Sequence, residues 1–170
     1  DVIYVLPNNK NIILAAQQAA KMIKDRQIFV IPSKSVPQGI TAMVNYMPES
    51  EPAEAAQVMT ESLATVSTGQ VTYAVRDTHM GAFDIKANDI LALLDGEICQ
   101  VGQDLTETTT ALLDKMTERT ADMISIYYGE DASEDEAQAL AEHIRQEHPE
   151  AEVEVYNGGQ PLYYYIISVE

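Results

Sequence analysis

Residues 5–11 read Val-Leu-Pro-Asn-Asn-Lys-Asn, and this stretch decides how the chain begins its fold. It ends a short apolar run over residues 2–6, which is typical of a strand covered on both faces. Apolar residues then recur at helical spacing from residue 12 to about residue 24. A second apolar run over residues 28–31 predicts another buried strand. Since a strand, a helix and a strand within ~30 residues form a βαβ unit, the sequence predicts a parallel, right-handed α/β lobe.

The corner between the first strand and the helix contains candidate binding residues. Asn8 or Asn9 is expected to cap the helix, because asparagine is a preferred N-cap residue. Unpaired amides at a helix N-terminus, with Lys10 beside them, would also form an anion site. The alternative is that one asparagine only caps the helix and that Lys10 is solvated. Asn8, Asn9 and Lys10 are therefore candidates for binding a carboxylate, a phosphate or a partner.

A polar loop is expected over residues 33–39, and it contains Gln38 and Gly39. In an open parallel sheet, ligands bind beyond the carboxyl ends of the strands, where this loop and the Asn8 corner both lie. Gln38 and Gly39 are therefore further candidates. Helices over residues 40–46 and from Pro52 to about residue 66 complete the lobe, and the Ser-Thr-Gly at 67–69 is expected to end the second of them. The predicted lobes are residues 1–68 and 69–170.

The second lobe is predicted to be a mixed or antiparallel sheet with helices. Residues 71–76 alternate between apolar and polar side chains, as in a half-buried strand. Asp95-Gly96 joins two apolar runs and is suited to a type I′ hairpin turn. Asp104 and Ser133 each precede a Glu at the spacing of a capping box, so a helix is expected after each. Further strands are expected over residues 123–128, around residues 153–155 and over residues 162–169.

Two polar stretches of this lobe are candidate binding elements. Arg76-Asp77 follows a predicted strand, where the guanidinium could meet a carboxylate or a phosphate. The alternative is a local Arg–Asp ion pair. Gly158-Gly159-Gln160 combines glycines that allow close backbone approach with a directed side-chain amide. The alternative there is a plain turn between two strands.

Composition excludes several classes of function. The chain has 27 Asp and Glu against 10 Lys and Arg, a net charge of −17, which opposes binding to nucleic acid or to anionic membranes. It contains no apolar run of ~18 residues and no signal-like start, so no membrane insertion is expected. Cys99 is the single cysteine, which fits a reducing cytoplasm. His79, His143 and His148 lack metal-ligand spacing with each other and with Cys99, so no metal site is expected.

No catalytic residue is predicted for this chain. It has no G-x-S-x-G elbow, no phosphate-binding G-x-x-x-x-G-K-[ST] loop and no G-x-G-x-x-G fingerprint. Cys99 lies in a predicted apolar hairpin, where a small structural residue is the simpler interpretation. The carboxylates fall mainly on predicted helix exteriors, so no acid/base pair stands out from them.

Four stretches taken together resemble the C-terminal domain of the catalytic subunit of bacterial fatty acid kinase, a family also described as dihydroxyacetone-kinase-like or as Dak phosphatase. The resemblance runs from Val2 to Glu170. It rests on Leu6-Pro7-Asn8-Asn9-Lys10-Asn11, Pro37-Gln38-Gly39, Thr72-Tyr73-Ala74-Val75-Arg76-Asp77-Thr78 and Gly158-Gly159-Gln160-Pro161-Leu162-Tyr163. One departure is Tyr164, where many relatives have proline. Another is that the family domain has a further segment, with its own Gly-Gly-Gln, before the first strand, so the first lobe is expected to be incomplete.

The resemblance implies a DegV-like fold and a role in lipid metabolism. The family phosphorylates a fatty acid that a separate DegV-like carrier protein presents, for phospholipid synthesis. ATP and magnesium would then bind in a separate kinase domain, and this chain would be a cytoplasmic, non-catalytic docking domain with no cofactor of its own. The alternative is a small-ligand domain in which Asn8, Asn9, Lys10 and Arg76 receive a fatty acid or an anion. A phosphatase is the third possibility, and a homodimer through an unpaired sheet edge is also expected to be possible.

Overall fold

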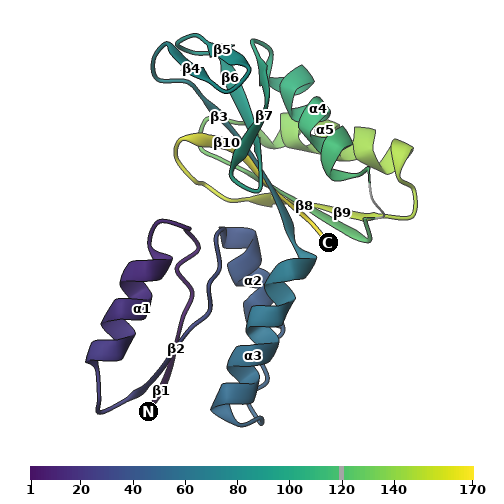
Figure 1. Cartoon of the computed structure of the whole chain (residues 1–170). Helices are drawn as coiled ribbons and strands as arrows, with labels where there is room; N and C mark the ends of the chain where they lie inside the picture. Colours follow the sequence, from purple (N-terminus) through teal and green to yellow (C-terminus); the bar gives the residue numbers. More distant parts are fainter. Residues whose placement is uncertain (119–120) are drawn as a thin grey trace. The chain divides into compact units, whose positions relative to one another are not determined.

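The computed structural model describes residues 1–118 and 121–170, and the chain divides into two compact units, Asp1–Val66 and Ser67–Glu170. The first unit has the predicted strand–helix–strand order (Figure 1). Its two strands are parallel, with Val2 opposite Gln27 and Val5 opposite Val30. Its elements are β1 (Val2–Val5), α1 (Ile13–Met22), β2 (Gln27–Val30), α2 (Val36–Val44), α3 (Pro52–Ser62) and the 3-10 turn η1 (Leu63–Thr65).

The core of the first unit lies between the sheet and helices α2 and α3. Ala42 and Met59 are fully buried there, and Ile31 is nearly so. Tyr4 stacks on Phe29 with ring centroids 5.6 Å apart, and its hydroxyl donates to the carbonyl of Pro52 at 3.2 Å. Helix α1, in contrast, has no buried residue. The stability of this unit therefore rests on α2 and α3 and not on α1.

The expected cap of α1 is wrong. The helix begins at Ile13 with Ile12 at its N-cap position, and no side chain among the described residues caps it. Asn8 has a φ of 52°, and the side-chain oxygen of Asn9 accepts from the backbone N–H of Asn11 at 2.9 Å. Asparagine side chains readily close such local turns. The asparagines therefore shape the corner ahead of the helix and do not cap it.

The expected loop over residues 33–39 is also partly wrong, because α2 already begins at Val36. Ser35 caps this helix and accepts from the backbone N–H of Gln38 at 3.3 Å. Pro37 lies in the first turn, where its missing N–H costs nothing. Gln38 and Gly39 are consequently helical residues.

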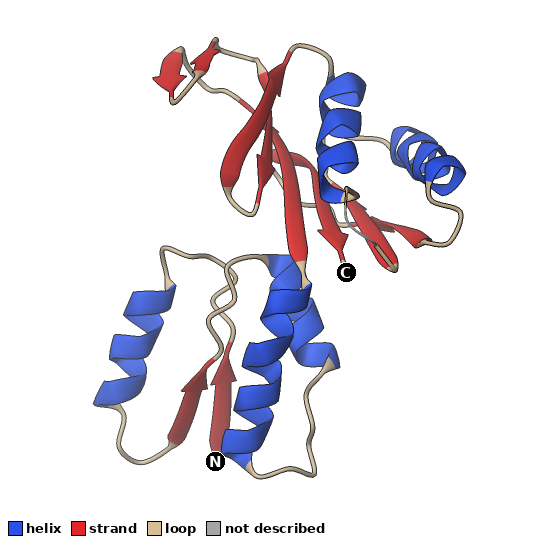
Figure 2. Cartoon of the chain, turned by 45° about the vertical axis from the view of Figure 1, so that its right-hand side comes forward, coloured by secondary structure: helices blue, strands red, loops and turns tan. Residues whose placement is uncertain are grey.

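The second unit is a six-stranded sheet with helices α4 and α5 on one face (Figure 2). The strand order is β7-β6-β3-β10-β8-β9, in which the β8–β9 pair is parallel and the other pairs are antiparallel. The fold is thus mixed α/β, as the sequence predicts. The strands of this sheet are β3 (Ser67–Tyr73), β6 (Ile90–Leu94), β7 (Glu97–Gly102), β8 (Met123–Tyr128), β9 (Glu152–Asn157) and β10 (Tyr163–Val169), and the helices are α4 (Leu105–Met116) and α5 (Glu134–Glu147).

Local signals in the second unit are confirmed. Asp95 and Gly96 both have positive φ, at 51° and 85°, as a type I′ turn requires. Asp104 caps α4 by accepting from the N–H of Glu107 at 2.8 Å, and the complete capping box forms at Ser133. The core between sheet and helices includes the fully buried Ala92, Leu112, Ile124, Ile126 and Ile167.

Two features of the second unit differ from expectation. The Ser-Thr-Gly at 67–69 does not end a helix but starts β3, where Ser67 lies opposite Val169 of β10. A small hairpin, β4 (Thr78–Met80) and β5 (Phe83–Ile85), is not predicted by the sequence, because its strands are too short to show a pattern. No helix in residues 1–118 or 121–170 is long and apolar enough to cross a membrane.

Candidate functional site

The corner after β1 is held by paired hydrogen bonds between Asn8 and Ser33. The backbone N–H of Asn8 donates to Ser33 Oγ at 3.0 Å, and Ser33 Oγ donates to Asn8 Oδ1 at 2.7 Å. Ser33 is fully buried. The two residues follow the carboxyl ends of β1 and β2, so these bonds fix the edge of the sheet at which ligands of open α/β sheets bind. Sequence reasoning missed Ser33, although a polar residue directly after a buried strand is a usable signal.

Gly39 lies against this corner. A Cβ at Gly39 would lie 2.2 Å from Asn8 Oδ1, so only glycine allows α2 to come this close. The structure therefore brings Asn8 and Gly39 together. Gln38 is bonded within the unit, since its Nε2 donates to the carbonyl of Leu63 at 3.1 Å and its Oε1 accepts from the N–H of Lys34 at 2.8 Å.

The anion site expected at this corner lacks the amides it needs. The N–H of Asn11 donates to Asn9 Oδ1, and the N–H of Ile12 donates to the carbonyl of Asn9 at 3.1 Å. The first turn of α1 lies further along the chain. Asn9 and Lys10 are exposed residues on this turn. What the corner offers instead is the Asn8 side chain at the rim of an apolar hollow.

This hollow has a volume of about 470 Å³ and lies between the end of β1 and the outer face of α2. Its apolar wall is exposed, with Met43 at 52% and Val44 at 79% exposure. The opposite face of α2 is buried, so the helix is apolar nearly all round, which is unusual for a helix that faces water. The lining residues are Leu6, Asn8, Val36, Gly39, Ile40, Met43 and Val44.

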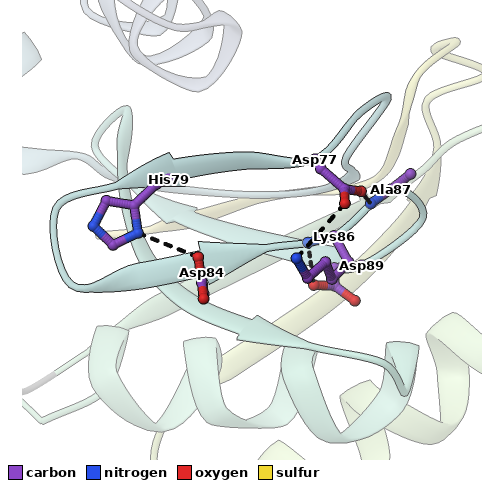
Figure 3. A network of polar contacts seen from close by, with 6 residues as sticks. All are labelled: Asp77, His79, Asp84, Lys86, Ala87 and Asp89. Carbon is purple, nitrogen blue, oxygen red and sulfur yellow. Dashed lines mark hydrogen bonds and ion pairs between the residues drawn. The ribbon is translucent and has the colours of Figure 1, made fainter.

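Arg76-Asp77 does not form the local ion pair that is the alternative interpretation of this stretch. Asp77 accepts from the backbone N–H of Ala87 at 2.9 Å and lies 3.6 Å from the ammonium of Lys86 (Figure 3). The Ala87 hydrogen bond, and after it the charge of Lys86, lower the pKa of Asp77. Asp77 therefore ties the end of β3 to the segment after β5, while Arg76 is exposed.

Gly158-Gly159-Gln160 forms an internal lock. Gln160 Nε2 donates to the carbonyl of Tyr127 at 2.9 Å and to that of Tyr163 at 3.4 Å. A Cβ at Gly158 would lie 2.0 Å from Gln160 Oε1, and Gly159 has a φ of 59°. The glycines thus make room for the Gln160 amide, which joins β8 to the start of β10. This explains the motif without a ligand.

Cys99 lacks the environment of a nucleophile. It is half-buried, and burial raises the pKa of its thiol. The nearby Lys115 ammonium donates to the Cys99 carbonyl at 2.6 Å. A raised pKa keeps the thiol protonated, whereas reactive cysteines need the thiolate.

Comparison with protein families gives a match over the whole chain. The FakA-like C-terminal family, which is the C-terminal domain of proteins like the fatty acid kinase FakA, matches residues 1–170. Protein YloV of Bacillus subtilis is 44% identical over 171 residues, which cover 100% of this chain and 31% of that protein. An uncharacterized protein of Staphylococcus haemolyticus is 40% identical over 166 residues, covering 98% of this chain and 30% of that protein. The chain thus spans about a third of the length of these relatives.

Solved structures with the same fold are DegV-like proteins. The DegV family protein Cg2579 from Corynebacterium glutamicum superposes with a TM-score of 0.69 at 15% identity, covering 99% of this chain and 74% of that one. The Streptococcus pneumoniae Fatty Acid Kinase (Fak) B3 protein, loaded with linoleic acid, gives a TM-score of 0.69 at 13% identity, with 98% and 70% covered. At such identities the likeness shows the fold, which is DegV-like.

Proposed function

Because this chain belongs to the FakA-like C-terminal family of fatty acid kinases, we propose that it is a non-catalytic domain that docks a DegV-like fatty-acid-carrier protein. The carrier's bound fatty acid is then phosphorylated by a separate ATP-binding domain, which also holds the magnesium ion. We place this reaction in the cytoplasm, where ATP is available. The carrier, not a membrane or a nucleic acid, is the proposed partner.

The outer face of α2 is the observation that carries this proposal. Val36, Ile40, Met43 and Val44 are exposed at helical spacing and form most of the wall of the hollow. A surface stripe of this kind costs solubility unless a partner covers it. Methionine and other large apolar residues are also typical of the centres of protein interfaces. We therefore assign α2, with Asn8 and Gly39 at its rim, as the face that meets the carrier.

The state of the polar candidates supports a non-catalytic role. The amide nitrogen of Gln160 and the carboxylate of Asp77 are bonded within their own unit. The Cys99 thiol has a raised pKa. A nucleophile or general base needs a free, directed group near a substrate. The polar groups singled out by the sequence instead hold the fold together.

Calorimetry of the chain with a purified DegV-like carrier tests the proposal. We expect saturable binding, and we expect Met43→Lys or Val44→Lys to weaken it at least 10-fold, because each places a charge in an apolar contact. Met22→Lys is the matched control, since Met22 is an exposed methionine on α1 at 81% exposure. No binding by the folded chain would contradict docking, and equal weakening by all three variants would contradict the assignment to α2.

The second candidate is a small-ligand domain that takes a fatty acid or an anion. The observation in its favour is the hollow itself, whose volume of about 470 Å³ lies within the usual range for ligand pockets. The polar side chain in its lining, Asn8, could bond a carboxylate. Native mass spectrometry of the purified chain should then show bound lipid. An empty spectrum, together with no thermal shift on adding fatty acids or phosphate, would contradict this candidate.

A homodimer is a separate proposal, because the outer strands β7 and β9 each have one unpaired edge within the sheet. Sedimentation velocity at several concentrations tests it. A concentration-dependent shift to twice the monomer mass is the expected result, and a single monomer species at all concentrations would contradict it.

A further inference from the structure

We propose that Asp114, His143 and Glu147 bind one divalent transition-metal ion of the zinc type. These residues lie on α4 and α5 of the second unit, whereas α2 belongs to the first unit. The inference goes beyond the docking function and does not depend on it.

The geometry of the three side chains is that of an open ligand set. His143 Nε2 and Glu147 Oε2 are 3.6 Å apart, one helical turn from each other on α5. One ligand atom from each of the three residues lies within 4.8 Å of the other two. With zinc bonds of about 2.1 Å, the ligand atoms of a tetrahedral site lie roughly 3.4 Å apart. The His143–Glu147 pair is already near this separation, and small rotations of the exposed Asp114 and Glu147 side chains would complete it.

The helices that carry these residues are firmly held. On α4, Leu112 and Leu113 are near neighbours of Asp114 in sequence and are buried in the core. On α5, Leu140 and Ile144 are buried in the same core. Ligands that project from two packed helices lose little freedom when an ion binds, which favours a defined site over a diffuse one.

The chemistry of the donors selects the class of ion. One imidazole nitrogen with two carboxylates suits zinc and its neighbours, whereas magnesium and calcium prefer oxygen ligands alone. Two carboxylates this close repel each other, and a cation would relieve that repulsion. Three protein ligands also leave a fourth position for water. Next to it, His143 lines a groove of about 350 Å³ with Thr106, Thr110, Glu136, Ala139 and Leu140.

The sequence does not indicate this site, because its ligands are not all close along the chain. His148, five residues after His143, pairs with Glu150 instead of joining the cluster. The third ligand, Asp114, comes from a different helix. Only the packing of α4 beside α5 brings the donors together.

Titration of the tag-free chain with Zn²⁺ in a calorimeter tests the proposal. We expect one ion per chain, and Co²⁺ in its place should give the visible absorption of a nitrogen- and oxygen-ligated site. His143→Ala and Glu147→Gln should each weaken Zn²⁺ binding at least 10-fold. His148→Ala and Glu142→Gln are the matched controls on and beside α5, and both should bind Zn²⁺ as the unaltered chain does.

Three outcomes would overturn the proposal: no saturable Zn²⁺ binding below about 1 mM, unchanged binding in His143→Ala, or equal weakening in the controls. Circular dichroism confirms that each variant is folded. If His143→Ala does not fold, Asp114→Asn takes its place, because Asp114 is exposed and the change keeps its size. Carrier binding measured with and without a chelator separates this site from docking, since failure here leaves the α2 face unaffected.

Discussion

Asn8 shows how one side chain can set the geometry of a corner. Its φ of 52° lies in the left-handed region, which asparagine tolerates better than most residues. Its carboxamide oxygen accepts from the buried Ser33 hydroxyl, and this same oxygen occupies the space in which a side chain at Gly39 would lie. Asn8, Ser33 and Gly39 are therefore a mutually dependent set, and α2 cannot approach the sheet in this way without all three.

Gly39→Ala tests this dependence. A glycine inside a helix would normally gain up to ~1 kcal/mol on replacement by alanine, but here the new Cβ would lie 2.2 Å from Asn8 Oδ1. We expect a net loss of about 1–3 kcal/mol in the free energy of unfolding. Urea denaturation measures it, and a double-mutant cycle with Asn8→Ala should show a smaller cost once the oxygen is gone. The same cost in both backgrounds would contradict the contact.

Gln160 is predicted to be structural on the same reasoning. Gln160→Glu replaces the donating amide nitrogen with an oxygen that faces the carbonyls of Tyr127 and Tyr163. We expect the free energy of unfolding to fall by about 2–3 kcal/mol, because a buried bond is lost and a repulsion is gained. Gln18→Glu, an exposed position on α1, is the matched control and should change it by less than ~0.5 kcal/mol. A similar small change at Gln160 would instead favour a ligand role for this loop.

At the scale of single elements, the sequence predicts best where the signal is local. Asp95-Gly96, the caps at Asp104 and Ser133, and the first βαβ unit each depend on residues a few positions apart, and all are confirmed. The Ser-Thr-Gly at 67–69 has turn-forming residues, yet pairing with β10 about a hundred residues away makes it a strand. Long-range pairing overrides local preference there, and no pattern within the segment indicates it.

The candidate site shows the same division. Asn8 and Gly39 are candidates from the sequence alone, and the structure brings them together. Ser33, which completes the corner, and the exposed stripe of α2 escape the sequence reasoning, because the helix is expected to begin later, at residue 40. Asp114 and His143 escape it as a pair, because only tertiary packing relates two helices that are separated by β8 in the sequence.

The capping box of α5 predicts a pH-dependent contribution to stability. Hydrogen bonds from the side chain and then the backbone N–H of Ser133 lower the pKa of Glu136 in the folded chain below its ordinary value of 4.5. A lowered folded pKa means that the contribution is present above about pH 4.5 and is lost as the pH falls through the folded pKa. Ser133→Ala should therefore cost about 1 kcal/mol at pH 7 and less at low pH.

Ser35→Ala provides the control for this effect. Ser35 caps α2 through the N–H of Gln38, so the residue at the matching position does not titrate. Its loss should cost a similar amount, with no change between pH 7 and low pH. Urea denaturation across this range measures both variants. An equal pH dependence for the two would show that Glu136 does not contribute through its charge.

At the scale of the whole molecule, charge is divided unevenly between the two units. Residues 1–66 contain five Lys or Arg and six Asp or Glu, whereas residues 67–170 contain five and 21. Nearly all of the net charge of −17 therefore belongs to the second unit. The apolar α2 face belongs to the nearly neutral unit, so the proposed docking surface is not one that a strong charge would keep apart from a partner.

This asymmetry predicts that salt stabilises the second unit selectively. Raising NaCl from about 0.01 M to 1 M shortens the Debye length from ~30 Å to ~3 Å, which screens the repulsion among the excess carboxylates. The ion pairs described in this unit, such as Lys86–Asp77, are largely exposed, and losing such a pair costs less than ~1 kcal/mol. Relief of repulsion should therefore prevail. Hydrogen exchange should slow by at least several-fold in the buried strands β8 and β10, and change little in β2 and α3 of the first unit, which serve as the internal control. Equal slowing in both units would indicate a general salt effect, and faster exchange in β8 and β10 would mean that the ion pairs outweigh the repulsion.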